Sequence, residues 1–478
     1  SLSLHQKRPV PPYSKPLKKK TSDDTPYFAS ESPLTIFTPL NYMNPDIISE
    51  TIDRTTAPIV HDMGPLSLPD DEIVTLQNGI SLHLLSGGDA EVSRIKILLP
   101  GGIAESPVPQ LYQMANSLLL EGTHTHPSDE LADILEYNGA WSGVDTSTHH
   151  SSLSLYCTND TYHTLLPLVR EMVTSPAFED EPVANALRAE AARLDVENHK
   201  VAYRAACAIR TLVYGHDHPL SAVPRPEQLL NITPSALREA HEKRLDPKGI
   251  HIYLSGRLSD SMISDTERMF STIPAREEFT LPRLQFPTHT EGGRVHVEMP
   301  DSLQSGVRLI IPAIGRIHPD YVPLRMAVIA LGGYFGSRLM LNIREEKGLT
   351  YGITASLLGY KHSGFISVSS QTDPSTVDML IEETVKEIER MKNPASYTPD
   401  EVTRLSRFVL SELAGVLDTP FSRMDFLQTR ITANAPAGYF AMQEQAARSL
   451  SPESLAEMAE KYFNTECLFI ATAGKSQV

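Results

Sequence analysis

The chain has 478 residues, too many for a single small module and enough for about three domains of ordinary size or two large ones. Hydrophobic residues make up 41% and charged residues 21% of the chain, which is typical of a globular protein and excludes disorder along its whole length. Acidic residues outnumber basic ones by 59 to 42, and the formal charge of −17 disfavours general binding to nucleic acid or to an anionic membrane surface.

The first 62 residues are predicted to form an extended N-terminal arm and lead-in. The first twenty contain several basic residues and prolines but no acidic residue, so this stretch has little with which to build a core. We interpret it as a solvated arm, and docking of the arm on an acidic partner is the alternative. The remainder, rich in Pro, Thr and Ser, shows no sustained period and indicates a lead-in to a folded body.

A first folded unit is predicted over residues 63–275. It opens with two short alternating runs, Ile73–Leu76 and Ile80–Leu85, and the Asn78-Gly79 pair between them predicts a β-hairpin. The elements expected next are a strand over Arg94–Leu99, helices over Pro109–Leu120 and Ser128–Asn138 (with Ser128 as N-cap), a strand over Ser151–Cys157, helices over Tyr162–Val173, Pro182–Val213 and Pro234–Leu245, and a strand over Gly249–Ser255. Strands and helices grouped in runs favour an α+β fold over a doubly wound parallel sheet.

A second unit, residues 291–478, is predicted to follow a linker over residues 276–290. The order of elements begins again there, with strands over Arg294–Glu298 and Val307–Ile311 and a helix over Pro323–Leu331. Residues 233–256 align without a gap with residues 451–474, and seven of these 24 positions are identical. In both copies a Ser or Thr precedes a Pro, a helix follows, and an apolar strand ends at Gly. The repeat indicates a duplication.

Most familiar catalytic and metal-binding patterns are missing from the sequence. The 17 histidines include three close pairs, but these stand beside turn-forming residues without a third ligand, which favours surface positions over a metal site. The three cysteines lie far apart without a CxxC pair, so they predict neither a disulfide framework nor a thiolate zinc site. GxSxG and GxxxxGK[ST] motifs are also absent.

The segment over residues 333–360 stands out from this background. Leu339 and Ile343 mark an apolar helix face, a charged end begins at Arg344, and Gly348 is a suitable residue to end the helix. A strand carrying Tyr351 is expected to follow. On these residues alone the segment is a helix, a glycine stop and a strand, with Arg344 in a surface ion pair.

The order LGGxFxSRL followed by IREEKGLTYG resembles the second half of the duplicated unit in the pitrilysin-like M16 zinc metallopeptidases, the family of insulinase and the mitochondrial processing peptidase. The resemblance extends over roughly residues 72–474. It implies two homologous halves, each a mainly antiparallel β-sheet packed with α-helices. It also implies that Arg344 and Tyr351, which have the family's spacing, hold and polarise a substrate peptide opposite the zinc.

The same resemblance implies a zinc-binding HxxEH helix in the first half, which this chain lacks. The positions in register hold Gln113, Asn116 and Ser117, and HxxEH occurs nowhere in the sequence. Amide and hydroxyl groups cannot replace two neutral imidazoles as strong zinc ligands, and an asparagine cannot act as a general base. Glu190 lies near the position of the family's third ligand but cannot hold a metal alone; a solvated place on a polar helix face is the alternative. No metal is therefore expected in this chain.

The M16 family includes heterodimers in which only one subunit carries zinc. This sequence resembles the subunit that lacks the zinc ligands. We expect a non-catalytic subunit without zinc-peptidase activity alone, pairing with an HxxEH-bearing partner that carries the zinc and contributing Arg344 and Tyr351 to that site. The expected ligand is an extended peptide that pairs with a sheet edge. The alternatives are a structural scaffold without a proteolytic role and an independent hydrolase with a relocated metal. The compartment stays open, with the cytoplasm favoured over the periplasm or an organelle.

Overall fold

The structure is a computed structural model that describes residues 55–57, 59, 61–275, 280 and 291–476. The chain divides into residues Ser1–Asp62 and a larger unit, Met63–Val478. The predicted arm and the predicted linker lie almost wholly outside the described residues, so both stay predictions. Within the described part, none of the helices is both long enough and apolar enough to cross a membrane. The description below concerns the larger unit.

The first half of this unit is built on a mixed β-sheet. Within the described residues its strands, in order across the sheet, are β1 (Glu72–Thr75), β2 (Ser81–Ser86), β6 (His251–Gly256), β3 (Val92–Pro100), β5 (His150–Thr158) and β4 (Trp141–Thr146). All neighbours run antiparallel except β2 and β6, which are parallel. The predicted hairpin is confirmed, since β1 pairs with β2 and Gly79 adopts a φ of 98° in the turn.

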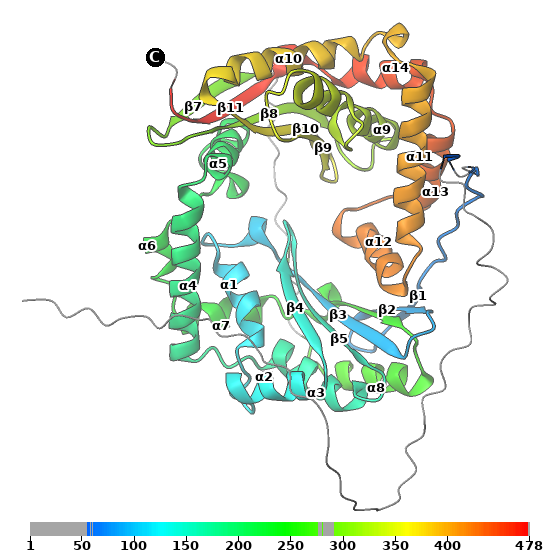
Figure 1. The fold of residues 1–478 in the computed structure, drawn as a ribbon. Coiled ribbons are helices and arrows are strands. Elements are labelled where there is room, and N and C mark those ends of the chain that lie inside the picture. The colour runs from blue at the N-terminus through cyan, green and yellow to red at the C-terminus, as the bar shows by residue number, and fades with distance from the viewer. Residues whose placement is uncertain (1–54, 58, 60, 276–279, 281–290, 477–478) are drawn as a thin grey trace, which may run out of the picture. The chain divides into compact units, whose positions relative to one another are not determined.

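One face of the first sheet forms the main core of its half. Because side chains alternate along a strand, Leu82 and Leu84 of β2 point to the same face as Ile95 and Ile97 of β3. The helices that contribute to this core are α1 (Leu111–Ser117), α2 (Ser128–Tyr137), α3 (Tyr162–Thr174), α4 (Asp180–Asn198), α6 (Pro226–Leu229), α7 (Pro234–Lys243) and α8 (Asp260–Phe270). In Figure 1, α2, α3 and α8 lie below the sheet.

The second half repeats the arrangement. Its described strands follow the order β7 (Gly293–Glu298), β11 (Phe469–Gly474), β8 (Ser305–Ile314), β10 (Ser363–Thr372) and β9 (Ile353–Gly359), again with one parallel pair, β7 and β11. Its helices are α9 (Tyr321–Gly332), α10 (Val377–Arg390), α11 (Pro399–Val416), α12 (Pro420–Thr432), α13 (Tyr439–Arg448) and α14 (Pro452–Tyr462). The order β7-β11-β8-β10-β9 corresponds to β2-β6-β3-β5-β4. The α+β fold with two homologous halves is thus confirmed.

The repeated segments occupy equivalent places in the two halves. Thr233 and Ser451 cap α7 and α14, each accepting a hydrogen bond from the backbone N–H three residues on, and a Pro follows each cap. The strands β6 and β11 both end at a glycine of positive φ, Gly256 at 124° and Gly474 at 155°. A Cβ on Gly256 would come within 2.3 Å of the Val92 carbonyl oxygen, so the close approach of neighbouring strands requires glycine there.

Two helices cross between the halves. The helix α5 (Val201–Tyr214) belongs to the first half by sequence, yet its Ile209 and Val213 pack against Ile310 and Phe365 of the second sheet. In return, α12 of the second half packs on the first sheet, where Asp425 accepts a hydrogen bond of 2.8 Å from Arg94. The halves therefore share cores in addition to having their own.

Three element predictions need correction. The helix expected over Pro182–Val213 is two helices, because the backbone at Lys200 is extended (ψ 125°) and turns α5 towards the second sheet. The helix expected over Pro109–Leu120 is the shorter α1 followed by a 3₁₀ turn over Leu118–Leu120. Ser128 is not an N-cap, since it is the first residue of α2 and its hydroxyl donates to Glu121 instead.

Candidate functional site

The three positions in register with HxxEH lie on α1, which packs against α7 and the strands β4 and β5. Asn116 is buried, and its Nδ2 donates to the carbonyl oxygen of Asp145 on β4 at 2.9 Å and to that of Ser152 on β5 at 3.2 Å. The Ser117 hydroxyl donates to the carbonyl oxygen of Met114 within the same helix, at 3.0 Å. Both side chains therefore serve the fold: Asn116 fastens α1 to two strands, and Ser117 is occupied by its own backbone.

Gln113 differs from these two because it lines a cavity. The cavity has a volume of about 380 Å³ and is also lined by Arg193 of α4 and by Tyr203 and Arg210 of α5. Within the described residues the Gln113 Oε1 atom is buried and accepts no hydrogen bond. An amide oxygen among guanidinium groups is a poor place for a divalent cation, because the cations repel it.

Glu190 is held by a neighbour on the same helix. Its two carboxylate oxygens accept hydrogen bonds from Arg193, at 2.6 Å from Nε and 2.5 Å from Nη2, and only 18% of its side chain is exposed. This hydrogen bond raises the pKa of Arg193. Glu190 is therefore not freely solvated, since its carboxylate is partly covered and paired with a cation.

A zinc ion does not fit the degenerate motif. Asn116 and Ser117 are engaged in hydrogen bonds, and Glu190 is paired with Arg193. In the part of the chain that the structure describes, no three His, Cys, Asp or Glu side chains are grouped so that they could hold a metal ion.

Arg344 lies near the end of the predicted helix in the second half. The helix is a short π-helix over Met340–Glu346, and it stops as expected before Gly348, whose φ is 63°. The Arg344 guanidinium pairs with Glu345, and its Cζ lies 4.6 Å from the centroid of the Phe335 ring. Because Phe335 is itself 64% exposed, these contacts orient Arg344 at the surface without burying it.

Tyr351 lies in the turn before β9, and not within the strand as expected. Its side chain is 94% exposed, and its hydroxyl makes no hydrogen bond to any described residue. It stands between two cavities of about 560 and 440 Å³, both of which are also lined by Gln304, Thr350 and Gln371. Arg344 lines the larger one. The structure therefore brings Arg344 and Tyr351 to one cavity, and places Gln113 on a different one.

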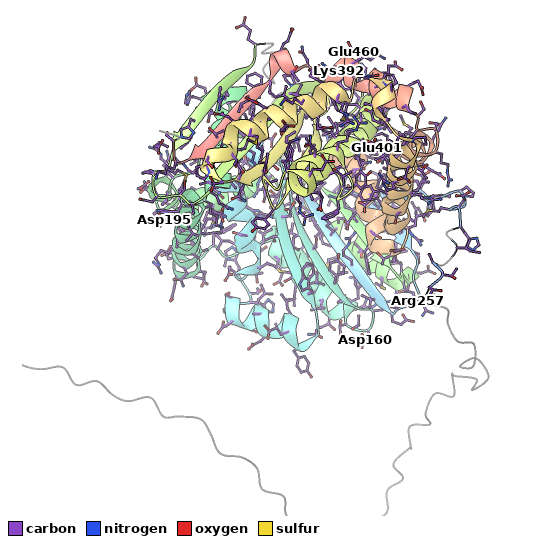
Figure 2. The ribbon with its side chains drawn as sticks, turned by 45° about the horizontal axis from the view of Figure 1, so that its top comes forward. Asp160, Asp195, Arg257, Lys392, Glu401 and Glu460 are labelled. Atoms are coloured by element: carbon purple, nitrogen blue, oxygen red, sulfur yellow. The ribbon has the colours of Figure 1, made fainter. Side chains whose placement is uncertain are left out.

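The arginine of the SRL motif is structural. Arg338 is buried and forms a bidentate pair with Glu401 of α11, at 2.7 Å and 3.2 Å, and its Cζ lies 3.9 Å from the centroid of the Tyr397 ring. It also donates to the Ser396 carbonyl oxygen at 3.0 Å. Glu401 is labelled in Figure 2. Arg338 thus anchors the segment that carries Arg344 to the core of the second half.

Some residues that meet in the structure belong to no motif that could be recognised in the sequence. His83 and His251, 168 residues apart, meet at 3.1 Å on the first sheet, and His83 donates from Nδ1 to Asp71 at 2.6 Å. Arg210 and Arg308 line cavities beside the predicted site residues although neither belongs to a motif. Only strand pairing and helix packing bring such residues together, so no local pattern could have indicated them.

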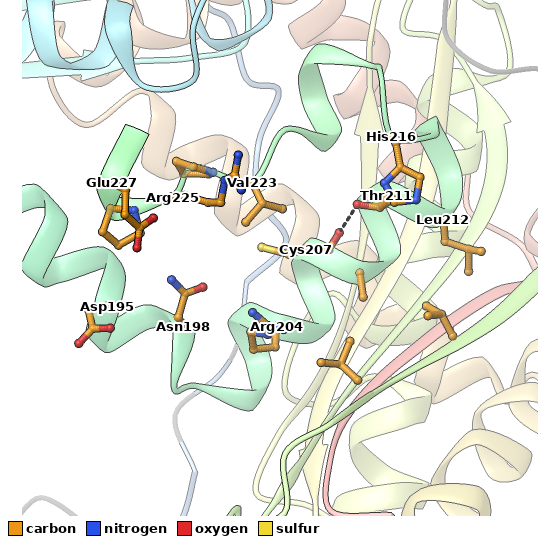
Figure 3. A pocket seen from close by; sticks show the side chains of 15 residues that line it. Asp195, Asn198, Arg204, Cys207, Thr211, Leu212, His216, Val223, Arg225 and Glu227 are labelled. Carbon is orange, nitrogen blue, oxygen red and sulfur yellow. Dashed lines mark hydrogen bonds between the residues drawn. The ribbon is translucent and has the colours of Figure 1, made fainter. Parts of the chain in front are cut away.

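A larger cavity, of about 800 Å³, lies on another side of α5, between α4, α6 and β7 (Figure 3). Figure 3 shows Asp195 and Asn198 of α4 on one wall and Arg204, Cys207 and Leu212 of α5 on another. None of the predicted site residues lines it. Its size alone therefore gives no reason to place the function there.

Comparisons with known proteins agree with this geometry. A family model described as "Peptidase M16 inactive domain" matches residues 231–407, which include Arg344 and Tyr351. The chain is 22% identical over 326 residues to the "Uncharacterized zinc protease YmxG" of Bacillus subtilis (strain 168) and 22% identical over 346 residues to its "Probable inactive metalloprotease YmfF". Each match covers 66% of this chain and 78% of the relative.

The fold has solved counterparts. The crystal structure of a peptidase M16 inactive domain from Pseudomonas fluorescens superposes with a TM-score of 0.78 at 22% identity, covering 86% of this chain and 99% of that one. The protein described as a protease from Helicobacter pylori gives 0.79 at 16% identity, with coverage of 85% and 100%. The family model over residues 231–407 and the curated relatives support an inactive-type member of the M16 peptidase family, the solved structures share its fold, and the sequence lacks the HxxEH motif.

Proposed function

We propose that this chain is the non-catalytic subunit of a two-chain zinc peptidase, and that it binds an extended peptide and presents Arg344 and Tyr351 to the zinc site of an HxxEH-bearing partner. One observation carries the proposal: Arg344 and Tyr351 line the same cavity, and the Tyr351 hydroxyl has no hydrogen bond to a described residue. A tyrosine that served the fold would be expected to bury its ring or to bond its hydroxyl.

The chemistry asked of this chain is hydrogen-bond donation. The partner's metal site would activate the water, while the Arg344 guanidinium and the Tyr351 hydroxyl would donate to the substrate carbonyl oxygen as negative charge develops on it. Arg344 is suited to this because its stack on Phe335 fixes the plane of the guanidinium while 31% of the side chain stays exposed.

A sheet edge supports peptide binding. In the described residues β4 pairs only with β5, so one edge of β4 keeps its backbone groups free to pair with an added strand. Trp141, at the start of β4, is 62% exposed and could cover an apolar side chain of such a peptide. Asn116 would support this edge indirectly, since it holds Asp145 of β4 to α1.

The test is a peptide-cleavage assay on this chain mixed with an HxxEH-bearing partner. We expect cleavage in the mixture and not with this chain alone, and we expect Arg344→Ala or Tyr351→Phe to lower kcat/KM by about 10²- to 10³-fold, the usual effect of losing one such donor. Arg404→Ala and Tyr137→Phe are matched controls, because Arg404 is an exposed arginine on α11 and Tyr137 is 91% exposed on α2. Equal activity of all four variants would exclude the proposed role and favour a scaffold.

A further inference from the structure

Two arginines that form no ion pair with a carboxylate of the described residues, Arg210 and Arg308, stand where α5 crosses the second sheet. Gly306 of β8 lies against the backbone of Val201 at the start of α5, and Ile310 of β8 packs against Ile209 of α5. Arg308 lies between these contacts and points to the same face as Ile310, because side chains alternate along the strand. Arg210 directly follows Ile209 on α5.

Neither guanidinium is neutralised by the part of the chain that the structure describes. Arg308 forms no ion pair there, and the one side-chain hydrogen bond of Arg210 runs to the Cys207 sulfur at 3.4 Å, while its Nε is buried without an acceptor. Burial, and then the proximity of Arg210, lower the pKa of Arg308. Half-buried arginines are usually paired with acids. Because these two arginines repel each other instead, an anion bound beside them would be stabilised.

The other ionisable groups nearby do not supply that anion. Burial raises the pKa of Tyr203 to about 12, so its phenol is neutral at physiological pH. Glu190 is occupied by Arg193, and Asp217, which is exposed and lines the cavity with Arg210, forms no ion pair with a described residue. The remaining groups around Arg308 are neutral hydrogen-bonding side chains: its cross-strand neighbour Ser369, and Thr354 beyond it, bonded to Ser369 at 2.9 Å.

Arg308 connects these arginines to the surface that carries the proposed function, whereas Arg210 lines a separate cavity. Arg308 lines the cavity of about 440 Å³ that Tyr351 also lines, and Arg210 lines the cavity that contains Gln113. A peptide whose backbone reached Tyr351 would therefore have Arg308 within the same cavity. Guanidinium groups bind carboxylates through paired, charge-assisted hydrogen bonds, which gives such a pair selectivity for an acidic ligand.

We propose that Arg210 and Arg308 form a carboxylate-binding site that selects acidic peptides, through an Asp or Glu side chain or through the peptide's C-terminal carboxylate. This rests on the proposed peptide-binding function and names its ligand class. Binding would neutralise two cations that the described residues leave without an ion pair, so the acidic ligand, and not a neutral one, would gain affinity.

The test measures binding by the full chain without any partner subunit. The probes are four rhodamine-labelled decapeptides of alternating Val and Thr with either three Glu or three Gln, each made with a free C-terminus and with an amide, followed by fluorescence anisotropy. We expect the peptides that carry a carboxylate to bind roughly tenfold or more tightly than the neutral one. The Gln peptide with a free C-terminus and the Glu peptide with an amide separate the two sources of the carboxylate.

The double variant Arg210→Gln with Arg308→Gln is expected to remove this preference and to leave the affinity for the neutral peptide unchanged. The double lysine variant, which keeps both charges and much of the buried stem, should retain part of it and guards against a folding defect in the glutamine variant. Arg204→Gln is the matched control, because Arg204 lies on the same helix and lines the cavity of Figure 3 instead.

Three results would overturn the proposal. The first is equal affinity for acidic and neutral peptides, or no binding of any of them. The second is a preference for acidic peptides that survives in the double glutamine variant. The third is displacement of the acidic peptide by inorganic phosphate at equal concentration, which would reassign the site to a free anion. Each is distinguishable from failure of the proposed function, which is read from cleavage in the mixture of two chains with Arg344 and Tyr351 variants.

Discussion

The helix α1 and the segment from Arg344 to Tyr351 make contrasting use of polar side chains. On α1, Asn116 is buried and holds two strands, whereas Tyr351 is almost wholly exposed and holds nothing. Both carry the positions at which the resemblance to M16 peptidases implies chemistry. The difference is that Asn116 of the first half serves packing, while Tyr351 of the second half is left exposed on a cavity that Arg344 also lines.

The largest expected effect is a dependence of the free energy of unfolding on pH, and it arises from three histidines on the first sheet. Burial lowers the pKa of His83, His150 and His251, all on the first sheet, to about 4. In the unfolded chain each would titrate near 6.5. The unfolded state therefore binds more protons between these values, so this contribution is complete above about pH 6.5 and is lost as pH falls towards 4.

Urea unfolding between pH 8 and 4.5 would measure it. We expect a total loss on the order of 5 kcal/mol, less than three independent histidines would give because the three interact. Asp71 does not hold His83 protonated, since Arg430 also pairs with that carboxylate. In the variant His251→Gln, the free energy of unfolding should fall less steeply with falling pH, by the slope that corresponds to the uptake of about one proton on unfolding. A free energy of unfolding that stayed constant down to pH 4.5 would contradict the prediction.

The second effect tests whether α1 is committed to packing. We expect Asn116→Glu to lower the free energy of unfolding by about 3 kcal/mol or more, because it removes two donors and places a carboxylate beside the carbonyl oxygens of Asp145 and Ser152. Gln113→Glu is the control on the same helix, and it should cost less than about 1 kcal/mol because Gln113 faces a cavity with Arg193 and Arg210. Equal costs in chemical denaturation would remove the distinction between the two positions.

A smaller effect concerns the turn that presents Tyr351. Gly348 has a φ of 63°, so Gly348→Ala should destabilise the protein by about 1 kcal/mol. Gly415 lies in α11 with open space around its Cβ position, so Gly415→Ala should instead stabilise it by about 0.5 kcal/mol. Thermal unfolding of the two variants beside the unchanged chain would show shifts of opposite sign; shifts of the same sign would mean that the turn tolerates a side chain.

The smallest expected effect on stability is that of replacing the exposed Tyr351. Tyr351→Ala should change the free energy of unfolding by less than about 0.5 kcal/mol, because the side chain is 94% exposed and unbonded. A loss above about 1 kcal/mol in urea unfolding would show that Tyr351 supports the fold, and would weaken its assignment to a ligand.

Local features of the fold were predictable and distant ones were not. The hairpin at Asn78-Gly79, the capped helix before each repeated strand and the stop at Gly348 follow from residues a few positions apart. The break at Lys200 was missed because neither Gly nor Pro marks it, and the packing of α5 on the second sheet is a tertiary contact that no local pattern contains.

The candidate site divides in the same way. Arg344 and Tyr351 were found because their motif is contiguous, and the structure shows them on one cavity. The hydrogen bonds of Asn116 depend on strands 29 and 36 residues away, and the approach of Arg210 to Arg308 depends on the crossing of α5 over β8. Such contacts are fixed by tertiary packing, so no pattern within a window of sequence contains them.

The passage of α5 onto the other half's sheet has a consequence for dividing the gene. A fragment that began at residue 291 would leave Ile310, Phe365 and Phe469 without the helix that covers them, and would expose an apolar patch to solvent. A fragment that ended at residue 275 would carry α5 with its apolar face uncovered. Neither piece would be a good candidate for expression alone, but the two together would be suited to complementation, in which recovery of a soluble pair reports their association.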